Sequence, residues 1–467
     1  MLPRLLLAAG LLLMLARPVS AQDAAPPSIP DAYTPAQSAP MDPAVPTVLP
    51  MRECADAINA MLAERLDTVL PLLMRRADVD MWIVSAREYN EDPVLKTMLP
   101  ATWLAARRRT MLVFHRPAEA PADSVERLAI ARYDVGDLFP SAWDKEEQPD
   151  QWARLAEIVS ERDPASIAIN RSETFALADG LTDTEDAQLR EALPERYRER
   201  LTSDDRLAIG WLETRSALEQ TVYPMIVRTA HAIIAEGFSE QVIQPGLTTT
   251  ADVEWWYRER IRDLGFTAWF HPSVSIQRAG MGEDGDFSSD ADAATVRPGD
   301  LLHVDFGITY LRLNTDTQQH AYVLRPGETD APDGLTAALR IGNRLQDHLT
   351  DEFATGRTGN EVLAAALQAA RDEGIRPTIY THPIGHHGHG AGPLIGLWDQ
   401  QGGVPGRGDY PLYANTAYSI ELNAETSIPE WDGQDILIKL EEDAFFDGNT
   451  VRYLDGRQTE LYLIPRP

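Results

Sequence analysis

The sequence has little positive charge, almost no cysteine and no long hydrophobic run beyond its first residues. Lys and Arg total 42 against 72 Asp and Glu, which gives a formal net charge of -30. Phosphate binding and adhesion to anionic lipid both need a cationic face, so this balance argues against nucleic-acid and membrane-surface partners. The acidic excess by itself indicates no more than solubility. Cys54 is the single cysteine, which excludes an internal disulfide.

Two common sequence signatures are also missing. No glycine-rich loop opens a helix after a predicted strand, so neither a dinucleotide site nor a P-loop is expected. No repeat of solenoid period is present. The 467 residues, 44% of them hydrophobic, suffice for two domains or one large domain with a full core.

The first 21 residues have the pattern of an export signal. Arg4 precedes an apolar run over residues 5–15, and the small residues Ser20 and Ala21 stand directly before Gln22. Such a run is too short to span a bilayer comfortably, whereas a basic start, an apolar core and a small-residue cleavage site are typical of a signal peptide. We therefore predict that residues 1–21 are removed from an exported protein, periplasmic or secreted, with no membrane insertion after cleavage.

The remaining chain divides into a linker and two parts. Residues 22–50 carry eight prolines and predict an extended linker. Residues 51–207 alternate helical and strand patterns, as in a small α/β domain. Residues 208–467 combine long helical patterns with strands, which predicts an α+β class overall. The expected elements of this second part are helices at 213–236, 252–264, 335–353 and 360–373, strands at 301–307 and 320–324, and a strand-rich end from residue 417.

Histidine is concentrated in one glycine-rich loop. Four of the ten histidines lie at positions 382, 386, 387 and 389. Neutral imidazole is the commonest nitrogen ligand for metals, so the loop is a candidate metal site. Taken alone, the loop fits a solvated turn equally well.

Several acidic residues lie inside apolar, strand-like segments. Asp305 follows Leu-Leu-His-Val, Glu421 follows Tyr-Ser-Ile, and Glu441 follows Leu-Ile-Lys-Leu. A single acid in such a segment usually faces water at a sheet edge, but Asp and Glu are rarely buried unless they are paired or bound to a cation. Asp316 stands eleven residues after Asp305, and the two carboxylates converge if a hairpin joins them. Carboxylates with one imidazole suit a two-metal site for Mn, Fe, Co or Zn.

In this order and spacing the chain resembles the pita-bread metallopeptidases, which include methionine aminopeptidase, aminopeptidase P and prolidase. The family's Gly-Asp before its first ligand is matched by Gly299-Asp300, and its His-x-x-Gly followed by a second histidine is matched by His382, Gly385 and His389. The resemblance covers residues 213–467 well and extends more weakly over residues 52–205 to the creatinase-like N-terminal domain. It implies five metal ligands: Asp305, Asp316, His382, Glu421 and Glu441.

Two histidines of the family pattern are not assigned uniquely in this sequence. His386 is a rival for the histidine ligand, although only His382 places Gly385 and His389 where the family has them. The family usually has another substrate-facing histidine about eighteen residues before the first aspartate, where this chain has Phe287. His271 is its candidate replacement if residues 280–294 are an insertion.

The resemblance also implies a chemistry. Two divalent ions, most simply Mn, would lower the pKa of a bridging water, and the resulting hydroxide would attack the peptide bond. Glu421 would accept the water's proton and pass it to the leaving amine, and His389 would bind the scissile carbonyl. The expected activity is release of the N-terminal residue from peptides, with an Xaa-Pro preference. The resemblance also leads us to expect a dimer or tetramer. A creatinase- or prolidase-like hydrolase and a non-catalytic peptide-binding relative are the alternatives.

Overall fold

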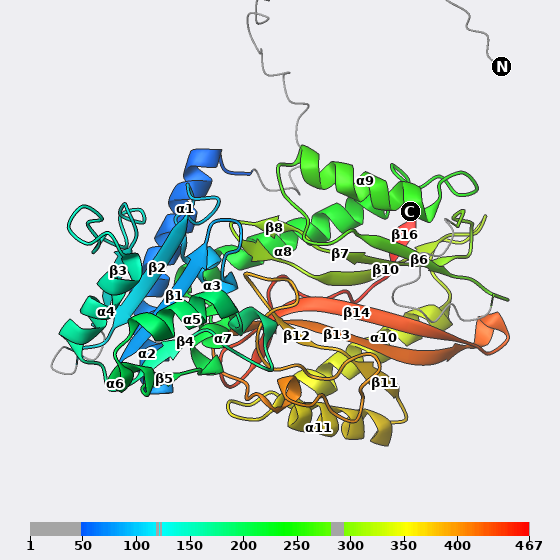
Figure 1. Ribbon diagram of the computed structural model, residues 1–467. Helices are drawn as coiled ribbons and strands as arrows, with labels where there is room; N and C mark the ends of the chain where they lie inside the picture. The colour runs from blue at the N-terminus through cyan, green and yellow to red at the C-terminus, as the bar shows by residue number, and fades with distance from the viewer. Residues whose placement is uncertain (1–47, 118–120, 122–123, 282–293, 467) are drawn as a thin grey trace, which may run out of the picture. The chain divides into compact units, whose positions relative to one another are not determined.

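The computed structural model describes residues 48–117, 121, 124–281 and 294–466 of the chain (Figure 1). The predicted signal segment, nearly all of the predicted linker and Phe287 lie outside these described residues. Described residues up to Glu213 build one sheet with its helices, and those that follow build a second, larger sheet. Both sheets belong to one unit, residues 44–467.

The first sheet has the strand order β3-β2-β1-β4-β5, in which β1 pairs antiparallel with β2 and parallel with β4. Its central strand is apolar on both faces because helices cover both. Ile83 packs with α4 and α5, while Trp82 packs on the other face with α2 and α7. The strands are β1 Met81–Arg87, β2 Arg109–His115, β3 Glu126–Ile130, β4 Ile167–Ile169 and β5 Leu201–Thr202.

Four helices of this part, α3, α4, α5 and α7, begin at a residue whose side chain caps the helix. Asp150 accepts hydrogen bonds from the backbone of Trp152 and Ala153 and thereby starts α4. The predicted domain boundary at residue 207 falls inside α7, whose apolar residues pack in the first core. The helices are α1 Met51–Glu64, continued by a π-helical turn at Arg65–Val69, α2 Leu70–Ala77, α3 Pro93–Met98, α4 Gln151–Arg162, α5 Asp183–Ala192, α6 Glu195–Arg198 and α7 Asp205–Glu213.

Long helices flank the second sheet. Capping boxes start three of them, α8, α9 and α11, with Ser216, Thr249 and Thr358 as the capping residues. Figure 1 shows α8 and α9 on one side of the strands and α10 and α11 on the other. These helices are α8 Ala217–Gly237, α9 Thr250–Asp263, α10 Asp333–Thr350 and α11 Gly359–Asp372.

The second sheet runs in the order β11-β13-β14-β10-β7-β6. Even-numbered residues of β7, such as Val304, pack with α8 and α9, and even-numbered residues of β13 and β14 pack with α10 and α11. Odd-numbered positions of the same strands are therefore free to carry polar groups. The strands are β6 Ser273–Gln277, β7 Leu301–Phe306, β8 Thr309–Tyr310, β9 Leu313–Asn314, β10 Thr317–Val323, β11 Arg376–Ile379, β12 His382–Ile384, β13 Thr416–Ile428, β14 Gln434–Phe446, β15 Val451–Tyr453 and β16 Tyr462–Ile464.

The α+β prediction is confirmed, and most of the predicted elements lie where the sequence patterns put them. The strand β7 is preceded by a turn in which Gly299 has φ +94°, and a Cβ there would lie 2.6 Å from the Arg325 side chain. Asp300 in the same turn is buried and accepts hydrogen bonds from Arg278. The Gly299-Asp300 pair therefore sets the start of β7, and Asp300 is not among the predicted ligands.

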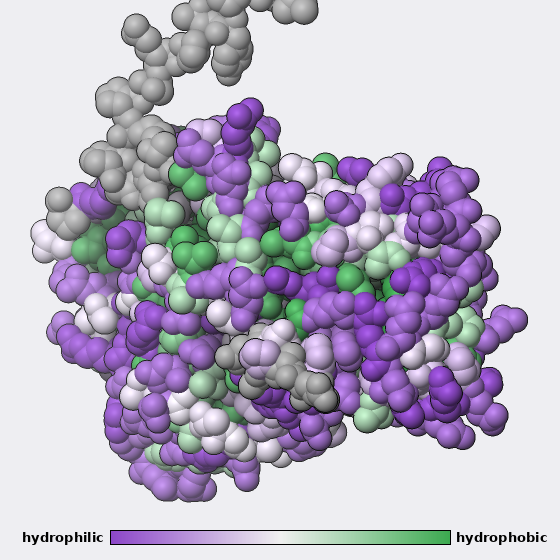
Figure 2. Space-filling model, turned by 90° about the vertical axis from the view of Figure 1, so that its left-hand side faces the viewer, coloured by the Kyte–Doolittle hydropathy of each residue, from purple (hydrophilic) through white to green (hydrophobic). Residues whose placement is uncertain are grey.

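One face of the molecule is largely hydrophilic, in keeping with the high content of charged residues. Figure 2 shows hydrophilic residues over most of one face, with hydrophobic residues mainly across its middle. Within the described residues, no helix combines the length and apolar character needed to cross a membrane.

A buried ion pair fixes α8 to the larger sheet and leads to a stability prediction. His231 lies 2.9 Å from Glu442 and 3.1 Å from Asp455. Burial opposes protonation of His231, but the two carboxylates outweigh it and raise the pKa from 6.5 to about 10. Replacing His231 with Gln is expected to lower the free energy of unfolding by about 3 kcal/mol near pH 6, because Glu442 is left buried without a cation.

The pH dependence of this loss follows from the raised pKa. The protonated pair stabilises the fold fully below pH 6.5, and the contribution disappears as the pH rises towards 10. Urea unfolding at pH 6 and at pH 9.5 should therefore give a smaller difference between the variant and the parent at the higher pH. Arg228→Gln is the matched control, since its exposed guanidinium contacts the same Asp455 and should contribute less than about 1 kcal/mol. An equal loss at both pH values would contradict the assignment.

Candidate metal centre

Four polar side chains form a row across the larger sheet. Glu421 of β13 is the direct partner of Glu441 of β14, Glu441 is the partner of Gln318 of β10, and Gln318 is the partner of Asp305 of β7. Directly paired residues project from the same face of a sheet. Two carboxylates directly opposite one another are destabilising unless a cation lies between them, so the register itself creates a site for positive charge.

Asp316 and His382 join this row from the same side. Asp316 lies two residues before Gln318 in the chain, and His382 of β12 pairs with Ser419, two residues before Glu421. The Nε2 atom of His382 is 3.8 Å from Asp316 and 3.7 Å from Glu441. The structure thus brings together all five residues that the sequence predicts as ligands.

The ligand atoms fall into overlapping groups in which all atoms lie within 4.8 Å of one another. One group is Asp305, Asp316 and Glu441, and another is His382, Glu421 and Glu441. Glu441 belongs to both groups. Two neighbouring sites that share one carboxylate are the arrangement expected of a two-metal centre.

The residues present fit divalent cations, and unpartnered buried atoms support this. The Nδ1 atom of His382 lies 3.0 Å from the carbonyl of Pro383, which leaves Nε2 directed at the carboxylates without a hydrogen-bond partner. A metal-bound histidine normally holds its second nitrogen in this way. One buried oxygen of Asp305 also has no partner. The donor set of four carboxylates and one imidazole suits Mn, Fe, Co or Zn.

Burial and mutual repulsion perturb the acids of this cluster. Burial, together with the neighbouring Glu441, raises the pKa of Asp305, Asp316 and Glu421 well above the ordinary range. Without a cation, keeping these buried carboxylates charged costs free energy, and bound cations would offset that cost.

The four loop histidines have different surroundings. His386 lies 3.5 Å from Glu219 and 3.3 Å from the carbonyl of Arg312, away from the carboxylate cluster. Burial, reinforced by Arg215, lowers the pKa of His387 to about 4. His382, and not the rival His386, therefore faces the carboxylates.

His389 is the exposed member of the site. One of its ring nitrogens groups with Asp316 and His382 within 4.8 Å. Its ring packs edge-on against Trp269 at 5.2 Å between centroids, and it lies 6.1 Å from Tyr380. Partial burial and the neighbouring His382 lower the pKa of His389 to about 4, so the imidazole is neutral at pH 7. It is positioned to donate a hydrogen bond to a group bound beside Asp316 and His382.

A glycine next to His389 is required by close packing. A Cβ on Gly388 would lie 2.3 Å from the indole ring of Trp269. That ring in turn donates from Nε1 to the carbonyl of Thr315, the residue before Asp316. The aromatic side chain thus lies between the loop that carries His389 and the strand end that carries Asp316.

His271 does not join the described cluster. Its ring packs on Trp255 of α9, and its Nε2 atom lies 3.9 Å from Glu254. The alternative position, Phe287, lies outside the described residues. The contacts of His271 with α9 give no support to the possibility, left open by the sequence, that it replaces the substrate-facing histidine of the family.

Three further polar residues of the site were not among the predicted site residues. Gln318 donates to Glu421 and Glu441, Ser419 donates to Glu441 at 2.5 Å, and Asp443 accepts from the backbone of Asp316 at 3.2 Å. Strand alternation contained a signal for them, because each stands two residues from a predicted ligand and so shares its face. Gln318 and Ser419 carry no charge, so a search for acidic residues and histidines does not find them.

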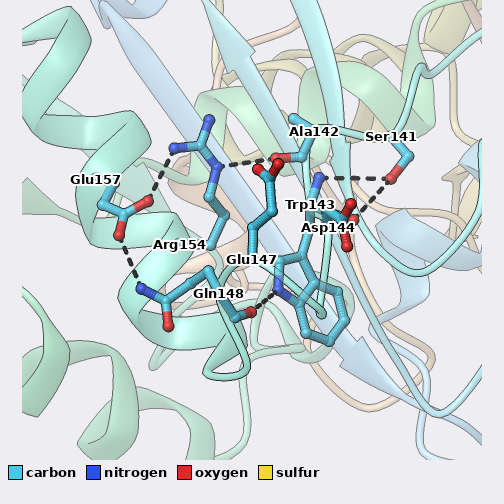
Figure 3. Close-up of a pocket in the computed structure, with 8 residues that line it drawn as sticks. All are labelled: Ser141, Ala142, Trp143, Asp144, Glu147, Gln148, Arg154 and Glu157. Atoms are coloured by element: carbon cyan, nitrogen blue, oxygen red, sulfur yellow. Dashed lines mark hydrogen bonds and ion pairs between the residues drawn. The ribbon is translucent and has the colours of Figure 1, made fainter.

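A separate hollow occurs in the N-terminal part of the chain (Figure 3). Its volume is about 510 Å³. The guanidinium of Arg154 is already held there by Glu157, Glu161 and the carbonyl of Ala142. These contacts engage Nε and Nη1 of the arginine, and none of the predicted site residues lines the hollow. Its lining consists of Ser141, Ala142, Trp143, Asp144, Glu147, Gln148, Arg154 and Glu157.

Comparison with known proteins finds a family match within the part of the chain that carries the larger sheet. Residues 226–448 match the model of metallopeptidase family M24. No curated protein sequence matches the chain significantly.

Solved structures match over most of the chain. X-Pro aminopeptidase from Thermotoga maritima has a TM-score of 0.58 at 17% identity, covering 84% of this chain and 99% of its own. Xaa-Pro dipeptidase from Bacillus anthracis has 0.52 at 15%, covering 89% and 100%. Aminopeptidase PepP from Pseudomonas aeruginosa has 0.52 at 14%, covering 88% and 96%. At these identities the likeness establishes the fold, a pita-bread domain preceded by a smaller one.

Proposed function

Since residues 226–448 belong to metallopeptidase family M24, we propose that the protein is an aminopeptidase that needs two divalent metal ions and releases the N-terminal residue of peptides with proline in second position. The observation that carries the proposal is the pair of ligand groups that share Glu441. Its proposed place of action, the periplasm or the medium, rests on the predicted signal segment alone.

The five ligands have different tasks in this proposal. Asp305 would hold one ion, His382 and Glu421 would hold the other, and Asp316 and Glu441 would be shared between the two. When bound, the two ions would supply a water of lowered pKa as the nucleophile. Manganese is our first choice of metal, with zinc, cobalt and iron as alternatives that the same donor set accepts.

Two side chains act on the reacting groups. Glu421 accepts a proton from the nucleophilic water and delivers it to the leaving amine. The neutral imidazole of His389 donates a hydrogen bond to the scissile carbonyl and stabilises the oxyanion that develops there. The position of His389 beside His382 and Asp316 supports this role. The retention of all five ligands argues against a metal-free hydrolase and against a non-catalytic peptide binder.

A dipeptidase is the second candidate, and one cation favours it. Arg407 lies close enough to His389 and Tyr380 to interact electrostatically with both side chains. Among the described residues, Arg407 forms no ion pair. A guanidinium beside the scissile bond is suited to bind the carboxylate of a dipeptide, whose C-terminus lies one residue beyond that bond.

Substrate length and sequence separate these functions. We expect the protein, loaded with Mn²⁺, to release alanine from Ala-Pro-Ala at least tenfold faster than from Ala-Ala-Ala. Hydrolysis of Ala-Pro but not of Ala-Pro-Ala would show a dipeptidase and contradict the aminopeptidase proposal. Equal rates for the two tripeptides would remove only the proline preference. No release from any of the three peptides with Mn²⁺, Zn²⁺, Co²⁺ or Fe²⁺ would refute the proposed function.

A further inference from the structure

We propose that Gln318 is a positioning residue that orients Glu421 and Glu441 towards the metal ions and thereby sets the metal affinity of the centre. This inference rests on the proposed function, because it assumes that these carboxylates bind metal. It concerns a residue that is neither an acid nor a histidine and that lies between the two halves of the site.

The contacts of Gln318 are unusually specific. Its side-chain nitrogen lies 2.8 Å from Glu421 and 2.7 Å from Glu441, and the residue is only 2% exposed. Both amide protons are used, one on each carboxylate. In the sheet, Gln318 stands directly between Glu441 and Asp305. One uncharged side chain therefore touches ligands that belong to both groups.

A second contact fixes which end of the amide faces the acids. The side-chain oxygen of Gln318 lies 2.9 Å from Nε2 of His303, and Nδ1 of His303 lies 3.4 Å from the hydroxyl of Ser275. Because carboxylates only accept hydrogen bonds, the NH₂ group must point to them and the oxygen to His303. His303 then donates from Nε2, and Nδ1 accepts from Ser275. Hydrogen bonds are therefore donated in one direction, from Ser275 through His303 and Gln318 to the carboxylates.

An uncharged donor suits this place. Lysine or arginine here would neutralise the negative charge that attracts the cations, and an apolar residue would leave the carboxylates free to rotate apart under their mutual repulsion. The amide holds one oxygen of each carboxylate and leaves the net charge intact. Contacts of this kind around metal ligands typically change metal affinity by 10- to 100-fold.

The neighbouring residue supplies a matched control. Gln319 is 3% exposed and lies on the same strand, but its side chain points to the other face of the sheet. Its nitrogen donates to Glu442 and its oxygen accepts from Tyr462. Neither partner is a proposed ligand. The two glutamines therefore share type, burial and strand, and they differ in the face of the sheet on which they lie and in the groups they contact.

The test is the affinity for Mn²⁺ alone, measured by calorimetry on the full chain after removal of metal. Gln318→Met should weaken Mn²⁺ binding by 10- to 100-fold, and Gln319→Met should change it less than threefold. His303→Leu, which removes the partner of the amide oxygen, should weaken binding by a smaller factor of about 3 to 10. Thermal unfolding of the metal-free proteins shows whether each variant folds, and His303→Leu serves as the test if Gln318→Met does not.

The outcomes separate the inference from the proposed function. Wild-type binding of Mn²⁺ together with unchanged binding by Gln318→Met, or by His303→Leu where the first variant fails to fold, overturns the inference and leaves the function standing. Equal weakening by Gln318→Met and Gln319→Met also overturns it, because the effect then comes from general loss of packing. Failure of the wild type to bind any of Mn²⁺, Zn²⁺, Co²⁺ or Fe²⁺ overturns the proposed function and the inference with it.

Discussion

Replacement of Glu421 by Gln is expected to lower kcat for hydrolysis of Ala-Pro-Ala by about 10³-fold. The amide cannot accept the proton of the nucleophilic water, and it is a poorer metal ligand than a carboxylate. Glutamine has nearly the same shape and can still meet the amide of Gln318, so the variant should fold. Circular dichroism and thermal unfolding measure the folding, and steady-state kinetics at saturating Mn²⁺ measure the loss.

A control for this variant lies on the same strand. Glu425 of β13 is paired with Arg376 at the surface, four residues beyond Glu421. Glu425→Gln should retain the activity of the parent within about twofold, since a surface ion pair contributes little to stability. If Glu421→Gln kept full activity while Glu425→Gln behaved as expected, the general-base role would have to be abandoned.

Removal of divalent metal is expected to abolish hydrolysis and to lower the stability of the fold. Burial and mutual repulsion raise the pKa of Asp305, Asp316 and Glu421 in the protein without metal, and bound cations would relieve that repulsion. Free Mn²⁺ at a hundredfold excess over its Kd should stabilise the folded state by about 2.7 kcal/mol for each site. Activity after dialysis against a chelator, its recovery with Mn²⁺, and the rise in unfolding temperature check this.

Glu441 decides whether that stabilisation comes from the proposed centre. Because this carboxylate belongs to both ligand groups, Glu441→Gln should remove most of the rise in unfolding temperature that Mn²⁺ produces. Asp435→Asn changes an exposed acid of the same strand, which is paired with Arg376, and should leave the rise intact. A full rise in the Glu441 variant would place the stabilising ion elsewhere in the protein.

The sequence predicts much of the site because its signals are local. Acids inside apolar strands, two aspartates eleven residues apart and a histidine followed by glycine are recognisable without any knowledge of tertiary contacts. The strands around Asp305, Glu421 and Glu441 form as predicted, since their even-numbered residues pack against helices and force the acids to the other face. The resemblance to the family favoured His382 over His386, because only His382 places Gly385 and His389 where the family has them, and the surroundings of the two histidines agree with it.

Other features depend on contacts between distant parts of the chain. His271 was a reasonable substitute by its type, yet it packs on Trp255 of α9. The boundary after residue 207 followed a change of pattern, whereas α7 continues to Glu213 because its apolar face completes the first core. The pairing of His231 with Glu442 joins residues 211 positions apart, and no periodicity along the sequence indicates it.

The sequence by itself determined which residues are available as ligands, since composition, strand alternation and spacing are properties of neighbouring residues. Only the tertiary structure decided that Glu421, Glu441, Gln318 and Asp305 stand side by side in one row. The physical reason is register: a shift of one residue in any strand would turn its side chains to the opposite face. That register is held by the packing of four helices against the sheet, and it makes an uncharged glutamine part of the proposed metal centre.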